Sequence, residues 1–310
     1  MEQRMKISSS PHIRDKESTG SIMRQVMVAL LPAAFFGIYN FGMRALLITL
    51  LTIVCSIGWE AGYQKLLGRR ITLRDGSAAL TGLLLAMNLP PDVPFWLPVI
   101  GSFFAIIVVK QLFGGLGQNF MNPALGARCF LLISFTGHMT SFSYDAVTTA
   151  TPLAELKTGG SVDVMSMALG TIPGTIGETC AVALILGGLF LMARGIIDYR
   201  IPISYLGTFA GLILLYALAA GRGLDVSFLL AHLFGGGLML GAFFMATDYV
   251  TSPITPAGRI WFGILLGMLT FLFRVFGASA EGVSYAIIIG NLVVPLLERI
   301  TIPKAFGKEA

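Results

Sequence analysis

Long apolar runs alternate with short polar stretches along most of this chain, and the alternation predicts a bundle of membrane helices. The runs cover residues 26–43, 45–62, 78–89, 94–112, 124–136, 176–193, 203–219, 228–247, 260–278 and 282–298. Most approach the ~20 residues that a helix needs to cross a bilayer. The third and fifth runs are shorter and are bordered by Gly, Asn and Pro. We therefore predict discontinuous or tilted helices at those two places.

The ten runs form two sets of five that resemble each other. In the first set, residues 81–91 lead into a long helix and then to residues 122–126. In the second, residues 241–248 lead into a long helix and then to residues 281–285. Because five is odd, the second copy must enter the membrane in the opposite orientation. The prediction is an all-α polytopic membrane protein with about ten transmembrane helices in two inverted five-helix repeats, a plan similar to that of urea transporters.

This pattern divides the chain into five parts. They are a polar cytoplasmic tail (1–24), a first five-helix repeat (25–136), a polar loop (137–175), a second five-helix repeat (176–299) and a short basic tail (300–310). The polar start of the chain gives no sign of a signal peptide.

Composition agrees with a membrane protein. The 310 residues are 55% hydrophobic and 12% charged, whereas soluble domains carry about 25% charged residues. Cys55, Cys129 and Cys180 lie inside apolar runs at irregular spacing, so we expect neither a disulfide framework nor a bound metal. The net charge of +5 reports membrane orientation and gives no reason to expect nucleic-acid binding.

The distribution of Lys and Arg predicts that orientation. If the amino terminus is cytoplasmic, the inner segments hold 16 basic residues and the outer segments hold four, with Arg128 left unassigned. Basic residues concentrate on the cytoplasmic side of membrane proteins. The polar loop 137–175 is therefore expected to face the outer side.

That loop contains the sequence Asp-Ala-Val-Thr-Thr-Ala-Thr-Pro-Leu at residues 145–153. A threonine hydroxyl needs activation before it can act as a nucleophile, either by a neighbouring base or by a modifying enzyme. Pro152 favours an extended conformation for Thr151, which would hold its side chain accessible. The alternative is a turn in which the hydroxyls only satisfy backbone groups.

These residues resemble a flavin-transferase motif, in which the last threonine is esterified to the phosphate of FMN. The match assigns Thr151 as the attachment residue within a motif that includes Asp145, Thr148, Thr149 and Ala150; the family more often has Gly at the position of Thr149. Together with residues 119–124 and 245–253, the motif resembles the family that joins the RnfD subunits of Rnf ion-translocating oxidoreductases to the NqrB subunits of the sodium-pumping NADH:quinone reductase. The resemblance covers roughly residues 22–303.

The resemblance implies a multi-pass subunit of a prokaryotic inner-membrane complex that passes electrons between ferredoxin and NAD and moves Na⁺ or H⁺. This subunit would carry covalent FMN, added by a flavin transferase, and would not be catalytic alone; noncovalent riboflavin is left open as a second cofactor. The chain has no dinucleotide fingerprint or cysteine cluster. NAD, iron–sulfur and second flavin sites would therefore lie on partner subunits. The alternative from another class is a passive channel for a small polar solute.

Polar residues near the predicted helix breaks are candidates for an ion pathway. Asn88 and Asp248 occupy matching places in the two repeats, and Asp248 follows a Gly-rich half-helix whose freed carbonyls could ligate a cation. The alternative is that Asp248 caps the next helix or pairs with a basic group. Asn119 and Asn122 are candidate flavin or ion contacts, with packing around a broken helix as the alternative. For His232 a packing role is favoured.

Three other charged groups lie close to apolar runs. Glu60 is expected to pair with Lys65 or Arg69 at the inner end of its helix. A buried partner and an anionic ligand are both open for Arg128. Glu178 is expected to favour the amino-terminal dipole of an outer-side helix.

Overall fold

The computed structural model describes residues 17–144, 147–148, 152–157, 162–178, 180–221, 223, 225–277 and 282–302. Asp145, Thr149, Ala150 and Thr151 lie outside these described residues, so the structure does not test their assignment.

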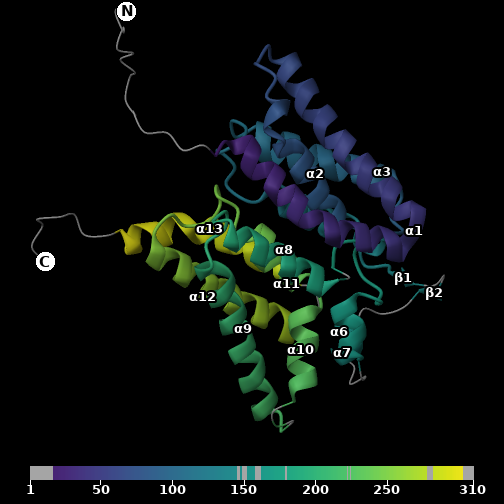
Figure 1. The fold of residues 1–310 in the computed structure, drawn as a ribbon, viewed down its shortest axis with the longest axis vertical. Helices are drawn as coiled ribbons and strands as arrows, with labels where there is room; N and C mark the ends of the chain where they lie inside the picture. Colours follow the sequence, from purple (N-terminus) through teal and green to yellow (C-terminus); the bar gives the residue numbers. More distant parts are fainter. Residues whose placement is uncertain are drawn as a thin grey trace, which may run out of the picture.

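The regular elements of the described residues are helices, apart from one two-stranded hairpin (Figure 1). The first part of the chain forms α1 (Thr19–Leu66), η1 (Leu73–Asp75), α2 (Ser77–Met87), α3 (Trp96–Phe103), η2 (Phe104–Gln111), α4 (Pro123–Ser134) and α5 (Thr136–Met139). A connecting segment follows with β1 (Ser143–Tyr144), β2 (Val147–Thr148), α6 (Pro152–Lys157) and α7 (Val164–Leu169). The last part forms α8 (Ala181–Ala193), α9 (Arg200–Ala219), α10 (Val226–Phe234), α11 (Leu238–Leu240), η3 (Gly241–Met245), α12 (Pro256–Val275) and α13 (Val283–Thr301).

Helix α1 consists of two helical segments, which we call its two legs. Its 48 residues would extend about 72 Å if straight, more than twice the ~30 Å hydrocarbon core. The helix breaks at Gly42, which has φ 73°, a conformation that glycine adopts without a side-chain clash. The first two predicted runs are therefore joined at a glycine and form one interrupted helix.

The predicted short and broken helices are present. Helix α2 has 11 residues and α4 has 12. The run at 228–247 is also interrupted, with α10 and α11–η3 meeting at a 60° bend. Gly236 and Gly237 lie at this break with φ 62° and 67°. Among the described helices, four are long and apolar enough to cross a membrane, or five if the bent pair is one span, as expected for a multi-pass membrane protein.

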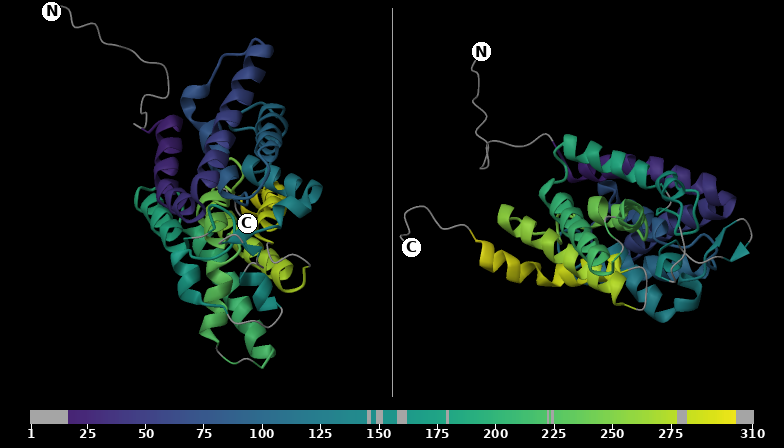
Figure 2. Two further views of the ribbon diagram at one scale, coloured as in Figure 1. Left: turned by 90° about the vertical axis from the view of Figure 1, so that its right-hand side faces the viewer. Right: turned by 90° about the horizontal axis from the view of Figure 1, so that it is seen from below.

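The first half of the molecule (α1 to α4) lies beside the second half (α8 to α13) in all views (Figures 1 and 2). The start of α1 and the end of α13 lie at one end of the molecule, and the β1–β2 hairpin lies at the other (Figures 1 and 2). Helix α7 packs against α10 through a small cluster that contains Met167, Ile172 and Ala231. The connecting segment is thus attached to the second half.

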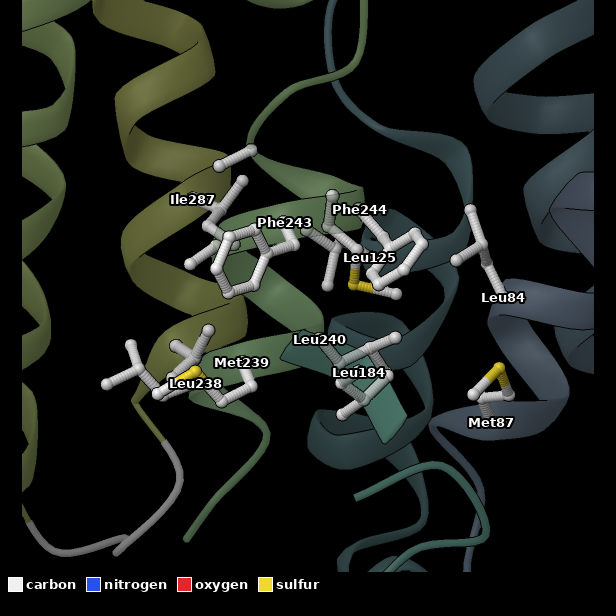
Figure 3. Packing of buried hydrophobic residues seen from close by; sticks show 14 of the residues in the cluster. Leu84, Met87, Leu125, Leu184, Leu238, Met239, Leu240, Phe243, Phe244 and Ile287 are labelled. Atoms are coloured by element: carbon white, nitrogen blue, oxygen red, sulfur yellow. The ribbon is translucent and has the colours of Figure 1, made fainter. Parts of the chain in front are cut away.

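Apolar side chains of α11 and η3 fill the space between the two halves. Phe244 lies beside Leu125 and on the side of Leu84 of the first half, Leu240 lies beside Leu184 of α8, and Phe243 lies toward Ile287 of α13 (Figure 3). Close approach is possible because glycines face this layer: a Cβ on Gly188 would lie 2.4 Å from the Phe243 ring. The part of the broken helix formed by α11 and η3 is therefore enclosed by protein.

Gly263 allows α12 to cross directly over α9. A Cβ at this position would lie 1.9 Å from Ser204 Oγ and 2.9 Å from the Ile201 carbonyl oxygen. Gly263→Ala should therefore lower the free energy of unfolding by about 1–3 kcal/mol, as overpacking does. The measurement is thermal unfolding in detergent, monitored with a dye that reacts with cysteine thiols as unfolding exposes them. The control is Gly207→Ala on α9, where a Cβ has open space; equal melting temperatures for both variants would contradict this prediction.

Candidate functional site

The two broken helices meet in the interior of the protein. Asn88 is the C-cap of α2, and its Nδ2 donates to the Leu84 carbonyl at 2.6 Å and lies 3.7 Å from Met245 Sδ at the end of η3. Asn122 is the N-cap of α4, and its Nδ2 donates to the Met245 carbonyl oxygen at 3.3 Å. The repeat pattern predicts this meeting of helices, which brings Asn88 close to the residues preceding Asp248.

Arg128 joins three separate segments at this centre. Its Nη1 donates to Asn88 Oδ1 at 2.6 Å, and its Nη2 donates to Glu178 Oε1 at 3.0 Å. Arg128 and Glu178 are 3% and 6% exposed. Of the two interpretations left open for Arg128, the buried partner is correct.

The expectation for Glu178 was wrong. Helix α8 begins at Ala181 with Cys180 as its N-cap, and the Glu178 carboxylate turns inward to Arg128. The two residues are 50 positions apart, so no local pattern in the sequence could have paired them.

A cavity of about 60 Å³ lies next to this centre, and Asp248 is one of its lining residues. Its polar lining residues are Ser77, Thr81, Lys110, Asn119, Asn122 and Asp248. This volume holds a few water molecules. Asn119 and Asn122 therefore lie on one cavity with Asp248.

Asp248 does not cap α12, whose N-cap is Thr255. The Thr251 hydroxyl donates to Asp248 Oδ2 at 3.1 Å, and the backbone N–H groups of Tyr249 and Val250 also bond to the carboxylate. The carboxylate closes a turn just after the broken helix. The helix-capping alternative is thus wrong for α12.

A second buried ion pair joins α1 to η2. Lys110 Nζ lies 2.9 and 3.0 Å from the two oxygens of Glu60 and donates to Ser77 Oγ at 2.7 Å. The predicted pairing of Glu60 with Lys65 or Arg69 was therefore wrong. Lys65 is five residues beyond Glu60 and therefore lies about 140° around the helix from it. Lys110, one of the 16 basic residues assigned to the inner segments, is 1% exposed.

Arg274 forms hydrogen bonds with the carbonyl groups at the break between α10 and α11. Its guanidinium donates to the carbonyl oxygens of His232, Gly235 and Gly236 and lies over the Phe209 ring. We expected the freed carbonyls at this glycine-rich break to be available to a transported cation. For these three carbonyl groups that expectation was wrong, because Arg274 is bonded to them. His232 itself is buried, with its ring edge-on to Phe228, which agrees with a packing role.

The chain directly after Thr151 lies against the same break. Pro152, Leu153, Glu178, Gly235 and Gly236 line a small cavity of about 10 Å³ together with Ile172, Pro173 and Gly174. That volume holds about one water molecule, so a flavin ring on Thr151 would have to lie outside this cavity. A Cβ on Gly236 would lie 2.5 Å from Leu153 Cδ1, so the connecting segment touches the break directly.

Two carboxylates outside the membrane-spanning helices have lowered pKa values. Hydrogen bonds from the Ser166 hydroxyl and the Met165 N–H lower the pKa of Asp163, the N-cap of α7. Burial alone would raise the pKa of Asp198, but the Arg200 N–H and the Arg259 guanidinium lower it below its ordinary value. The Asp198 pair links the loop before α9 to the start of α12.

Metal-binding groups do not cluster in the part of the chain that the structure describes: it holds no set of three or more His, Cys, Asp or Glu side chains placed for a metal ion. The three cysteines are free thiols.

Comparison with known proteins gives matches over nearly the whole chain. Residues 6–307 match the model described as the NQR2, RnfD, RnfE family. The D-type subunit of the Na(+)-translocating ferredoxin:NAD(+) oxidoreductase complex of Acetobacterium woodii is 50% identical, with 97% of this chain and 95% of that protein covered. The proton-translocating counterpart of Clostridium ljungdahlii is 44% identical, with 97% and 96% covered. The D-type subunit of the ion-translocating oxidoreductase complex of Aliivibrio salmonicida is 37% identical, with 97% and 98% covered.

Proposed function

The chain belongs to the NQR2, RnfD, RnfE family, and we propose that it is the RnfD membrane subunit of an ion-translocating ferredoxin:NAD⁺ oxidoreductase complex. Relatives that match at 50% and 44% identity over nearly their full length are named as that subunit of such complexes. The observation that carries the ion-translocating role is the polar centre at which two broken helices meet inside apolar packing. Buried polar groups at such meeting points are typical of ion pathways.

The proposed architecture is ten spans in two inverted repeats. The first repeat would consist of the two legs of α1, then α2, α3–η2 and α4; the second would consist of α8, α9, the broken α10–α11–η3, α12 and α13. Lys110 and Arg274 support the correspondence, because each is a buried cation near the end of the fourth helix of its repeat. An inner amino terminus and an outer connecting loop agree with the opposite placement of the α13 end and the β1–β2 hairpin (Figure 1).

We further propose covalent FMN on Thr151, attached through a phosphoester by a flavin transferase that recognises Asp145 and the following residues. When bound, FMN supplies a group that accepts and donates electrons. The cavity beneath Pro152 and Leu153 is too small for the ring, so the ring would remain accessible to partner subunits. The partners would include membrane, second flavoprotein, iron–sulfur and NAD-binding subunits; riboflavin would be a further, noncovalent cofactor.

The proposed ion pathway passes Asn88 and Asp248. Asn119 and Asn122 join it as ion contacts, since both line the Asp248 cavity; the alternative role in flavin binding has no such support. The energetics are feasible: two electrons falling through 100 mV release about 4.6 kcal/mol, and moving one charge against 100 mV costs about 2.3 kcal/mol. Such a drop drives at most about two ions per electron pair.

Inverted membrane vesicles that contain the complex test this function. Ferredoxin-dependent NAD reduction should drive uptake of sodium-22 or acidification of the lumen, and removal of the gene for this chain should abolish both processes. A passive channel, the rival interpretation, would let its solute equilibrate whether or not ferredoxin and NAD are present. Transport that is independent of redox substrates would therefore favour the channel.

Asp145→Asn tests the role of the motif in recognition. Because Asp145 is assigned to recognition by the modifying enzyme, the fraction of protein that carries flavin should fall, while the flavinylated fraction still passes electrons. The measurement is flavin fluorescence per protein band, compared with the rate of NAD reduction. Full flavinylation with lost electron transfer would show that this assignment is wrong.

A further inference from the structure

The Arg128–Glu178 ion pair separates two cavities in the interior. Glu178 lines the small cavity below Pro152 and Leu153. On the other side, Arg128 bonds to Asn88, which touches Met245, and Met245 in turn accepts from Asn122 on the Asp248 cavity. Polar groups therefore lead from Asp248 to the outer cavity, and the ion pair lies in the middle of that route.

We propose that Glu178 is a cation-exchange site, at which the transported cation displaces Arg128 as the partner of the carboxylate. This inference rests on the proposed ion-translocating function and adds a residue that controls it. In the structure the site is closed, with Arg128 Nη2 3.0 Å from Glu178 Oε1.

Electrostatics requires such an exchange if a cation passes here. The arginine side chain does not deprotonate in proteins, so its guanidinium repels any cation that approaches Asn88 or Glu178. A buried carboxylate left without a positive partner is strongly unfavourable. The carboxylate therefore releases Arg128 only as another cation arrives, so that it is never left without a positive partner. The local charge rises by one while that cation is bound and returns to its starting value when the cation leaves. Asn88 Oδ1 remains an acceptor for Arg128 during this step.

Glu178 is also positioned to respond to the segment that begins after Thr151. The Ile176 and Gly177 N–H groups donate to the carbonyl oxygens of Leu89 and Met87, which fixes the loop before Glu178 to the end of α2. On its other side, a Cβ on Gly237 would lie 2.5 Å from Glu178 Oε1, and Leu153 packs on the adjacent Gly236. A displacement of Leu153 at the break would therefore reach the carboxylate through the two adjacent glycines Gly236 and Gly237.

The test uses the assembled complex in inverted vesicles, with Glu178→Asp, Glu178→Gln and the double variant Arg128→Gln/Glu178→Gln. Glu178→Asp keeps the charge but shortens the side chain, and it should raise the Na⁺ concentration for half-maximal NAD reduction by about tenfold. For a proton-moving complex, the same variant should shift the pH profile of that reaction. Glu178→Gln should lower sodium-22 or proton uptake per NADH formed by at least about tenfold. The control Asp198→Asn removes a carboxylate from an inner-surface ion pair and should change neither quantity.

The double variant distinguishes cation exchange at Glu178 from a purely structural role of the Arg128–Glu178 ion pair. It removes both charges together, so it should assemble in the membrane yet remain defective in ion uptake. Normal uptake in the double variant, or an unchanged half-saturating cation concentration and pH profile in Glu178→Asp, would overturn the proposal even if Glu178→Gln fails to assemble. If wild-type vesicles take up no cation during NAD reduction, the proposed function itself fails; normal wild-type uptake with unaffected variants refutes only the role of Glu178.

Discussion

Replacing Thr151 with alanine is expected to remove all covalent flavin from the protein. The phosphoester needs the side-chain oxygen, and alanine provides none. Thr151→Ala protein should remain in the membrane at its normal amount, because the neighbouring Pro152 and Leu153 still fill their buried positions. The measurement is fluorescence of the protein band under ultraviolet light after denaturing electrophoresis, which should fall to background.

Two further variants make this result specific. Thr151→Ser retains a hydroxyl and should retain flavin, at least in part. Thr140→Ala removes a hydroxyl of the same kind outside the motif, and its fluorescence should equal that of the wild type. If Thr151→Ala keeps its fluorescent band, the attachment site must lie elsewhere, with Thr148 and Thr149 as the next residues to replace.

Local sequence signals predicted a large part of the fold. The short lengths of α2 and α4 followed from apolar runs that are bordered by Asn and Pro, because the ends of a helix leave backbone groups that a cap must satisfy. Asn122 illustrates this, because its side chain accepts from the Ala124 N–H at the start of α4. Family resemblance was readable because several separated motifs matched in the correct order.

The sequence did not predict how buried charges pair. Glu60 with Lys110 and Arg128 with Glu178 are each 50 residues apart, and their contact depends on how helices pack in three dimensions. A pattern search looks within one or two helical turns, and for this reason it favoured Lys65 and Arg69. One signal was available: charged groups inside apolar runs are costly, so an acidic and a basic residue in different runs should have been considered as partners.

The carbonyl groups at the α10–α11 break are a second feature that the sequence predicted only in part. The glycines correctly predicted an interruption, because Gly236 and Gly237 have positive φ angles. Sequence alone could not show that Arg274, 38 residues beyond Gly236, would bond to the exposed carbonyls. An unpaired buried carbonyl is unfavourable, so a break in the backbone implies some donor without identifying it.

Asp248→Asn is expected to uncouple ion movement from electron transfer. The substitution keeps the shape of the side chain and an oxygen that accepts from the Thr251 hydroxyl, but it removes the negative charge from the cavity. Since a carboxylate binds a cation more strongly than a neutral amide does, uptake of sodium-22 or protons per NADH should fall at least about tenfold. Electron transfer should slow or lose its dependence on Na⁺, because the ion and electron steps are linked.

The control for this variant is Asp163→Asn, which neutralises an exposed carboxylate at the start of α7 and should leave uptake unchanged. Ferredoxin-dependent NAD reduction and ion uptake are measured together in the same vesicles, so a loss of assembly would lower both rates in proportion. Uncoupling lowers the ratio of ions to electrons, whether or not electron transfer also slows. Normal values of both rates in Asp248→Asn would remove this residue from the pathway. Its role would then be structural, through the hydrogen bonds of its carboxylate with Thr251, Tyr249, Val250 and Asn119.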